Sequence, residues 1–125
     1  MAATSLPTTI LVVEDEALIC LHGMDVLEDA GFAVLDAADA DEALAVLAQQ
    51  QGDVALMFSD INMPGTMDGI ALANVVHRHW PGVRLLLTSA NHQPGLGAMP
   101  VTSRFMPKPW RHEALVRTIR GMLTG

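Results

Sequence analysis

Five short apolar runs, separated by stretches with helical spacing, constrain the fold of this chain more than any other feature. The runs cover residues 9–13, 32–37, 54–58, 83–88 and 104–106. Runs of this length without polar alternation are typical of strands that are buried on both faces of a parallel sheet. Because such strands alternate here with helical segments, the sequence predicts an α/β domain with helices on both faces of the sheet.

The connections between the strands limit the topology. Right-handed crossovers leave few arrangements at this size, and the flavodoxin-like (βα)5 sandwich with strand order 2-1-3-4-5 is the common one. Helical spacing is strong in four segments, residues 17–30, 39–51, 69–79 and 110–123. The expected fourth helix of this topology falls in residues 90–103, where two prolines and two glycines predict a short or irregular helix at most.

Local signals place the ends and faces of two helices. Asp39 and Glu42 have the spacing of a capping box, in which each side chain accepts a hydrogen bond from a backbone amide at the helix start. In the first helix, Leu18, Leu21 and Val26 are expected on the inward stripe, which Cys20 and Met24 can share.

Length and charge bound the class of protein. The 125 residues fit one domain, residues 9–125, after a flexible tail at residues 1–8. A formal net charge of −7 argues against nucleic acid and against an anionic membrane surface as partners. The N-terminal residues lack the pattern of a signal peptide, and no apolar run has transmembrane length, so we expect a soluble, cytoplasmic protein.

Acidic residues follow two of the predicted strands. Glu14 and Asp15 come directly after the first strand, and Asp60 comes at the end of the third. Alone, the first pair also fits a solvated loop or a helix cap. In the predicted topology, however, strands one and three are neighbours, so all three carboxylates meet at one sheet edge. Like charges this close are unfavourable without a cation. An all-oxygen donor set suits Mg²⁺, so the sequence predicts a magnesium site.

Two further polar side chains reach the same edge. Thr88 ends the fourth predicted strand and Lys108 follows the fifth. A carboxylate, a hydroxyl and an ammonium beside a Mg²⁺ site suit phosphoryl transfer to Asp60, because aspartate can accept a phosphoryl group covalently. Such transfer depends chiefly on positioning and charge neutralisation.

Four motifs in this order resemble the receiver domain of two-component response regulators. They are ILVVEDE at residues 10–16, FSDINMPG with MDG at residues 58–69, LLLTSA at residues 85–90 and FMPKPW at residues 105–110. Each motif is weak alone, but their order and spacing are specific. The resemblance spans nearly the whole chain and is to the single-domain form typified by the chemotaxis response regulator.

The resemblance implies a role for each site residue. Asp60 is the phosphoacceptor. Asp15 binds Mg²⁺ directly, Glu14 binds it mostly through water, and Asn62 offers its backbone carbonyl. The other implied roles lie in phosphoryl binding and switching: Thr88 as the switch hydroxyl, Lys108 as the partner of a phosphoryl oxygen, Phe105 as the aromatic switch residue in place of a frequent Tyr, and Lys108–Pro109 as a cis peptide bond.

The sequence departs from the usual receiver pattern in two places. The loop MPGTMDG after Asp60 is one residue longer than usual between its Met-Pro and Asp-Gly pairs. The fourth helix, which in the family forms a signalling face with the last strand and helix, is interrupted by Pro94, Gly95, Gly97 and Pro100. The usual output geometry and the usual dimer through this face therefore do not follow from the resemblance.

The resemblance predicts a switch that is not a turnover enzyme. A sensor histidine kinase or a histidine phosphotransferase is the expected phosphodonor, and the output is protein binding or onward transfer in a phosphorelay. The sequence leaves the cognate partners and the lifetime of the phosphorylated state open. A Mg²⁺-dependent phosphohydrolase with an aspartyl nucleophile is the alternative, but Asn62 stands where such an enzyme usually has a second acid. A flavin-binding electron carrier fits less well, since Glu14 and Asp15 would repel the flavin phosphate.

Overall fold

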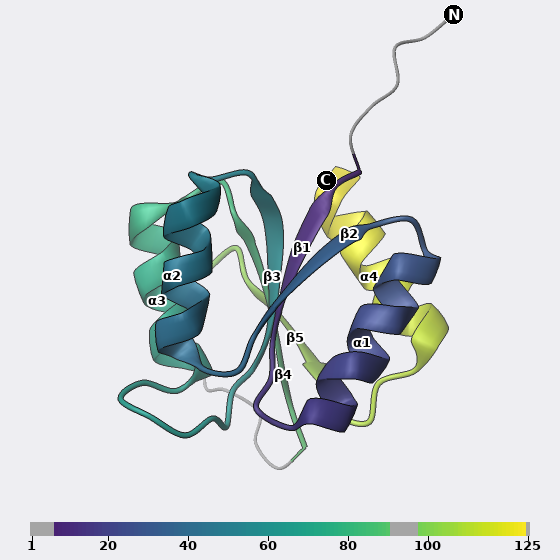
Figure 1. Ribbon diagram of the computed structural model, residues 1–125, viewed down its shortest axis with the longest axis horizontal. Coiled ribbons are helices and arrows are strands. Elements are labelled where there is room, and N and C mark those ends of the chain that lie inside the picture. Colours follow the sequence, from purple (N-terminus) through teal and green to yellow (C-terminus); the bar gives the residue numbers. More distant parts are fainter. Residues whose placement is uncertain (1–6, 91–97, 125) are drawn as a thin grey trace, which may run out of the picture.

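The computed structural model describes residues 7–90 and 98–124 and shows a parallel sheet with helices on both faces (Figure 1). The strand order β2-β1-β3-β4-β5 confirms the predicted flavodoxin-like topology. In chain order the elements are β1 (Thr9–Val13), α1 (Ala17–Asp29), β2 (Ala33–Ala37), α2 (Ala40–Gln50), β3 (Val54–Asp60), α3 (Gly69–His79), β4 (Arg84–Ser89), β5 (Arg104–Pro107) and α4 (His112–Thr124).

The sheet separates two apolar cores. Helices α2 and α3 cover one face, and α1 and α4 cover the other (Figure 1). Along β1, Leu11 and Val13 belong to the core under α2 and α3, whereas Ile10 and Val12 belong to the core under α1 and α4. Because side chains alternate along a strand and both faces are covered, most positions of such a strand are apolar.

Strand β3 is two residues longer than the sequence predicted. It continues through Ser59 to Asp60, which pairs with Thr88 of β4. The backbone of Asp60 is therefore part of the sheet, while its side chain stands at the C-terminal edge, where ligands bind in open α/β sheets.

The inward face predicted for helix α1 is confirmed at Val26, Cys20 and Met24 but is wrong at Leu18 and Leu21. Cys20, Gly23, Val26 and Leu27 are buried, whereas Leu18 is 81% exposed and Leu21 is 56% exposed. The buried positions follow the spacing of one helix face, and Leu18 and Leu21 lie outside it. The space beside Gly23 is filled by Trp110, whose ring lies 3.8 Å from where a Cβ atom on Gly23 would be.

The helix starts follow the sequence signals. The Glu42 amide donates to Asp39 Oδ1 (2.9 Å), which confirms one half of the predicted capping box. Glu42 Oε1 accepts from the Ala38 amide (3.3 Å), one residue before the N-cap, and not from the Asp39 amide. Helix α3 begins at Gly69, as predicted, and the Ala71 amide donates to the side chain of its N-cap residue, Asp68 (2.9 Å).

The weak helix predicted from the sequence would fall in the β4–β5 connection. Residues 91–97 lie outside the described residues, and residues 98–103 form turns that contain no helix. Elsewhere in the described ranges, none of the helices has the length and apolar character needed to span a lipid bilayer.

Candidate functional site

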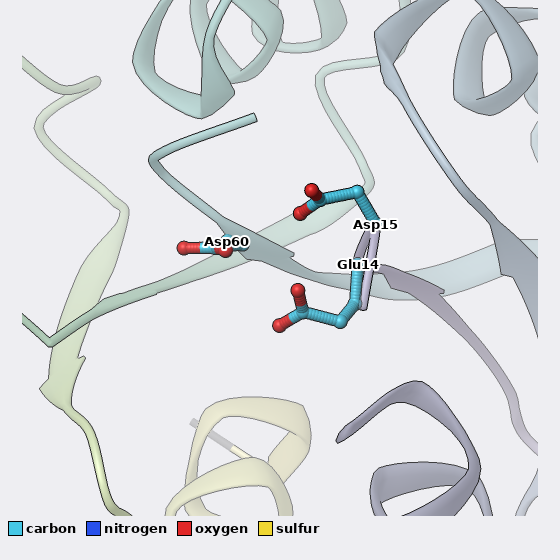
Figure 2. Close-up of side chains that lie close together, drawn as sticks. All are labelled: Glu14, Asp15 and Asp60. Carbon is cyan, nitrogen blue, oxygen red and sulfur yellow. The ribbon is translucent and has the colours of Figure 1, made fainter. Parts of the chain in front are cut away.

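Three carboxylates converge at the C-terminal edge of the sheet. Glu14 and Asp15 follow β1, and Asp60 ends the neighbouring strand β3, so adjacent strands carry all three (Figure 2). One oxygen from each lies within 4.8 Å of the others. Glu14 and Asp60 are 5% and 7% exposed, whereas Asp15 is exposed. Buried acidic groups this close repel one another unless a cation is present.

Lys108 supplies one positive charge to this cluster. Its Nζ lies 2.8 Å from Glu14 Oε1 and 3.2 Å from Asp60 Oδ2. Burial alone would lower the pKa of Lys108, but the hydrogen bond to Glu14 and the charges of Asp60 and Glu14 outweigh it and raise the pKa above its ordinary value. The ammonium is therefore charged at neutral pH and bridges the two buried carboxylates.

The charge of Glu14 is unfavourable even with this partner. Burial, above all, raises the pKa of Glu14, and the charge of Asp60 acts in the same direction. The hydrogen bonds from Lys108 and from the Glu16 amide (3.2 Å) oppose the shift without cancelling it. The cluster thus retains excess negative charge that a further cation would neutralise.

Thr88 faces the cluster from the next strand. It is the register partner of Asp60, and its side chain is buried. Among the described residues, Thr88 Oγ1 has no hydrogen-bond partner. A buried hydroxyl without a partner is costly, so Thr88 retains a donor for an acceptor that arrives at Asp60.

Asn62 ties the loop after β3 to β4. Its amide N–H donates to Asp60 Oδ1 (3.2 Å), and its side-chain Nδ2 donates to Ser89 Oγ (2.9 Å). Sequence reasoning did not assign Ser89 to the site. Its place directly after Thr88 at a strand end was the available signal, although the identity of its partner could not be read from the sequence.

Gly69 sets how closely α3 approaches the strand that carries Asp60. A Cβ atom at this position would lie 2.1 Å from the Asp60 carbonyl oxygen and 2.8 Å from Ile61 Cα. The Gly69 amide donates to the Ile61 carbonyl at 2.8 Å. Only glycine permits this close backbone approach, which packs the start of α3 against the end of β3.

The remaining site residues predicted from the sequence lie on β5 or just after it. Phe105 is the register partner of Leu87 and is half-buried against the core under α2 and α3, so it does not join the acidic cluster. The Lys108–Pro109 peptide bond is cis. The Lys108 amide donates to the Ser89 carbonyl (3.0 Å), which joins the segment after β5 to the end of β4.

The donor set fits a divalent cation. Three carboxylates stand against the single ammonium of Lys108, and the exposed Asp15 leaves the cluster open to solvent on one side. Hard cations such as Mg²⁺ take oxygen ligands and usually retain several waters. Glu14, Asp15 and Asp60 would hold such an ion.

An apolar groove of about 480 Å³ runs beside Lys108. Its lining residues come from α1, from the end of β4 and from the segment that follows β5: Leu18, Ile19, His22, Ala90, Lys108, Pro109 and Trp110. The rings of His22 and Trp110 stack with centroids 5.3 Å apart. The exposed Leu18 therefore belongs to a surface that adjoins the acidic site.

Comparison with known proteins identifies the family. The sequence model of the response regulator receiver domain matches residues 10–120. The chain is 30% identical over 118 residues to the sensor kinase CckA of Brucella abortus, covering 92% of this chain and 12% of that protein. It is 33% identical over 111 residues to the nitrogen assimilation regulatory protein NtrX of Azorhizobium caulinodans, covering 86% of this chain and 24% of that protein. The chain thus spans a quarter or less of these relatives.

Solved structures share the fold. The receiver domain of the hybrid histidine kinase CckA superposes with a TM-score of 0.80 at 29% identity, covering 92% of this chain and 98% of that one. The chemotaxis protein CheY4 of Vibrio cholerae gives a TM-score of 0.83 at 26% identity, covering 94% of this chain and all of that one. With its fold, its acidic cluster and the family match over residues 10–120, the chain belongs to the response regulator receiver domain family.

Proposed function

We propose that this protein is a response regulator receiver that accepts a phosphoryl group on Asp60 and relays its state through protein binding. The observation that carries the proposal is the surrounding of Asp60. The carboxylate lies among two further acids, the ammonium of Lys108 and the buried hydroxyl of Thr88. Among the described residues, this hydroxyl has no hydrogen-bond partner. This set supplies charge neutralisation and positioning, which are the main requirements of phosphoryl transfer.

A phosphohistidine is a suitable donor of the phosphoryl group. An oxygen of Asp60 forms a bond to phosphorus as the bond from phosphorus to the donor imidazole breaks, and the imidazole leaves with the electron pair. Mg²⁺ held by Glu14, Asp15, Asp60 and the Asn62 carbonyl would neutralise charge on the phosphoryl oxygens. Lys108 lies close enough to Asp60 to pair with one of those oxygens.

Switching follows from the new acceptor. The phosphoryl oxygens would take the hydrogen bond that Thr88 Oγ1 does not make in the described part of the chain. Movement of Thr88 would then bias the β4–β5 connection and Phe105, two residues before the β5 end at Pro107. Phosphorylation would in this way shift a pre-existing population of conformations.

The phosphodonor has a docking surface beside the site. We propose that a sensor histidine kinase or a histidine phosphotransferase docks on the groove formed by Leu18, His22 and Trp110, which places its phosphohistidine next to Asp60. We further propose that the protein acts in the cytoplasm and does not bind nucleic acid, in keeping with its net charge of −7.

Acetyl phosphate with Mg²⁺ tests the phosphoacceptor, with intact mass as the readout. The wild type should gain one phosphoryl group that is released by hydroxylamine, as expected of an acyl phosphate. Asp60→Asn should gain none, whereas Asp53→Asn, the same change at an exposed acid before β3, should react like the wild type. An unmodified wild type, or full modification of Asp60→Asn, would contradict the proposal. Continuous turnover of a phosphate ester would instead support a phosphohydrolase.

A second experiment separates docking from chemistry. Leu18→Glu places a charge on the groove but leaves the acidic cluster intact. We expect it to react with acetyl phosphate at the wild-type rate and to accept phosphoryl groups from a histidine phosphotransferase more slowly. A wild-type rate of transfer from the phosphotransferase to Leu18→Glu would show that the groove does not dock the donor.

A further inference from the structure

The charged residues of this chain are divided between its two halves. Every Lys and Arg lies at Arg78 or later, whereas all Asp and Glu residues except Glu113 lie at Asp68 or earlier. In the fold, the basic half comprises the end of α3, strands β4 and β5, and α4. The basic residues of this acidic protein are therefore concentrated toward the β4–β5 edge of the sheet and α4, and charges placed in this way steer and select oppositely charged partners.

A cleft of about 780 Å³ lies in this basic half, at the N-terminal ends of β4 and β5. Its polar lining includes Arg84, Arg104, His77 and Thr102, and none of the described residues that line it is acidic. Strand β4 rises by about 3.3 Å per residue, so the cleft lies about 16 Å from the end of β4 beside the acidic cluster. It is thus separate from the phosphorylation site.

Both arginines that line the cleft lie on the same sheet face. Arg104 pairs in register with Leu86, and Arg84 stands two residues before Leu86 on β4. Both are exposed, and in the described part of the chain neither forms an ion pair. Arg84 Nε donates to the Met122 carbonyl, which fixes this guanidinium at the end of α4. Its other N–H groups remain as donors, because a guanidinium has five.

The rim of the cleft favours a protein segment over a small anion. Val101 is 100% exposed and lines the cleft together with Pro81 and Gly82. Guanidinium groups pair well with carboxylates, and an apolar side chain on the rim can pack against one on a partner. We propose that this basal cleft, defined by Arg84, Val101 and Arg104, binds an acidic segment of a partner protein through Asp or Glu side chains.

A labelled peptide tests the proposal on the full chain. The probe is a short fluorescein-labelled glutamate peptide with a central leucine, and the comparison peptide has lysine in place of each glutamate. Anisotropy at low salt should show binding of the glutamate peptide only. Peptide binding should persist in Asp60→Asn, which cannot be phosphorylated on Asp60. A failure of peptide binding can therefore be distinguished from a failure of the proposed phosphorylation.

Matched arginine variants locate the binding. Arg104→Glu should weaken the affinity about tenfold or more, because it reverses a charge that faces the peptide carboxylates. Arg111→Glu makes the same change at an exposed residue outside the cleft and should have an effect of about twofold or less, since distant surface charges are screened. Equal weakening by both variants would show that only net charge matters and would overturn the proposal.

Two further controls keep the result interpretable. Arg104→Glu should still react with acetyl phosphate, which shows that it is folded. If it does not fold, Thr102→Glu adds a carboxylate at another exposed cleft residue and should weaken binding in the same way. Displacement of the glutamate peptide by inorganic phosphate at equal charge concentration would indicate a small-anion site and would also overturn the proposal, as would the absence of any binding at low salt.

Discussion

Replacing Lys108 by methionine should separate metal binding from phosphoryl transfer. Methionine keeps most of the aliphatic stem and removes the charge. In the wild type, Nζ lies 2.8 Å from Glu14 and 3.2 Å from Asp60, so Lys108 holds oxygens that a metal ion also needs. We therefore expect Lys108→Met to bind Mg²⁺ more tightly than the wild type, although it should accept a phosphoryl group more slowly.

The expected magnitude follows from the geometry. At a separation of about 5 Å, a double and a single positive charge repel by about 3 to 7 kcal/mol at an effective dielectric constant of about 20 to 40. The side chain of Lys108 is 14% exposed and flexible, so it can withdraw partly into water. We expect about 1.4 to 2.8 kcal/mol of the repulsion to remain, which corresponds to about ten- to hundredfold tighter binding.

Calorimetric titration with Mg²⁺ measures this effect directly. Lys108→Arg keeps the charge and should stay near the wild-type affinity, and Asp15→Asn should weaken binding if the titration reports the acidic cluster. Without Mg²⁺, Lys108→Met should also unfold more easily, by about 3 kcal/mol, because it leaves two buried carboxylates without a cation. A Mg²⁺ affinity of Lys108→Met equal to or below that of the wild type would refute this reasoning.

Three other changes test the surroundings of the site. Gly69→Ala should destabilise the protein by about 3 kcal/mol in denaturant unfolding, because the added Cβ overlaps the Asp60 carbonyl. The control Gly121→Ala, in open space on α4, should stabilise the protein by about 0.5 to 1 kcal/mol. Equal effects of the two substitutions would contradict the clash. Thr88→Val should make the unphosphorylated protein more stable by about 1 to 3 kcal/mol, since it removes a buried hydroxyl without a partner in the described residues. A loss of stability would show that the hydroxyl is bonded. Because burial raises the pKa of Glu14 above the unfolded value of 4.5, the stability due to this group is complete below pH 4.5 and is lost as the pH rises through the raised pKa. In metal-free thermal melts, the wild type should therefore gain stability relative to Glu14→Gln as the pH falls toward 4.5. A stability difference between the two proteins that does not change with pH would contradict the raised pKa of Glu14.

The sheet could be predicted from the sequence because its strands are covered on both faces. Runs such as Thr9–Val13 then become continuously apolar, and their order follows from the handedness of the crossovers. The inward face of α1 could be predicted only in part. Leu18 and Leu21 are more apolar than Gly23, but Gly23 leaves room for Trp110, which is distant in the sequence. Tertiary packing, rather than hydrophobicity alone, selected that face.

Part of the candidate site could be predicted from the rule that ligand-binding residues lie at the C-terminal ends of neighbouring parallel strands. That rule brings together Glu14, Asp15 and Asp60, and the structure places their oxygens within 4.8 Å. It does not give the contacts within the site. The pairing of Lys108 with Glu14 and the hydrogen bond from Asn62 to Ser89 depend on side-chain reach, which no strand pattern encodes.

The unpartnered hydroxyl of Thr88 has a consequence for how this domain responds to selection. A buried polar group without a partner in the described residues weakens the resting state by about 1 to 3 kcal/mol. A free energy of about 1.4 kcal/mol changes the ratio of two conformations tenfold, so satisfying this one group is enough to move the balance measurably. A screen for thermal stability alone would favour valine at this position and would yield a sturdier protein with a weaker response. Stability and responsiveness therefore compete at a single oxygen atom.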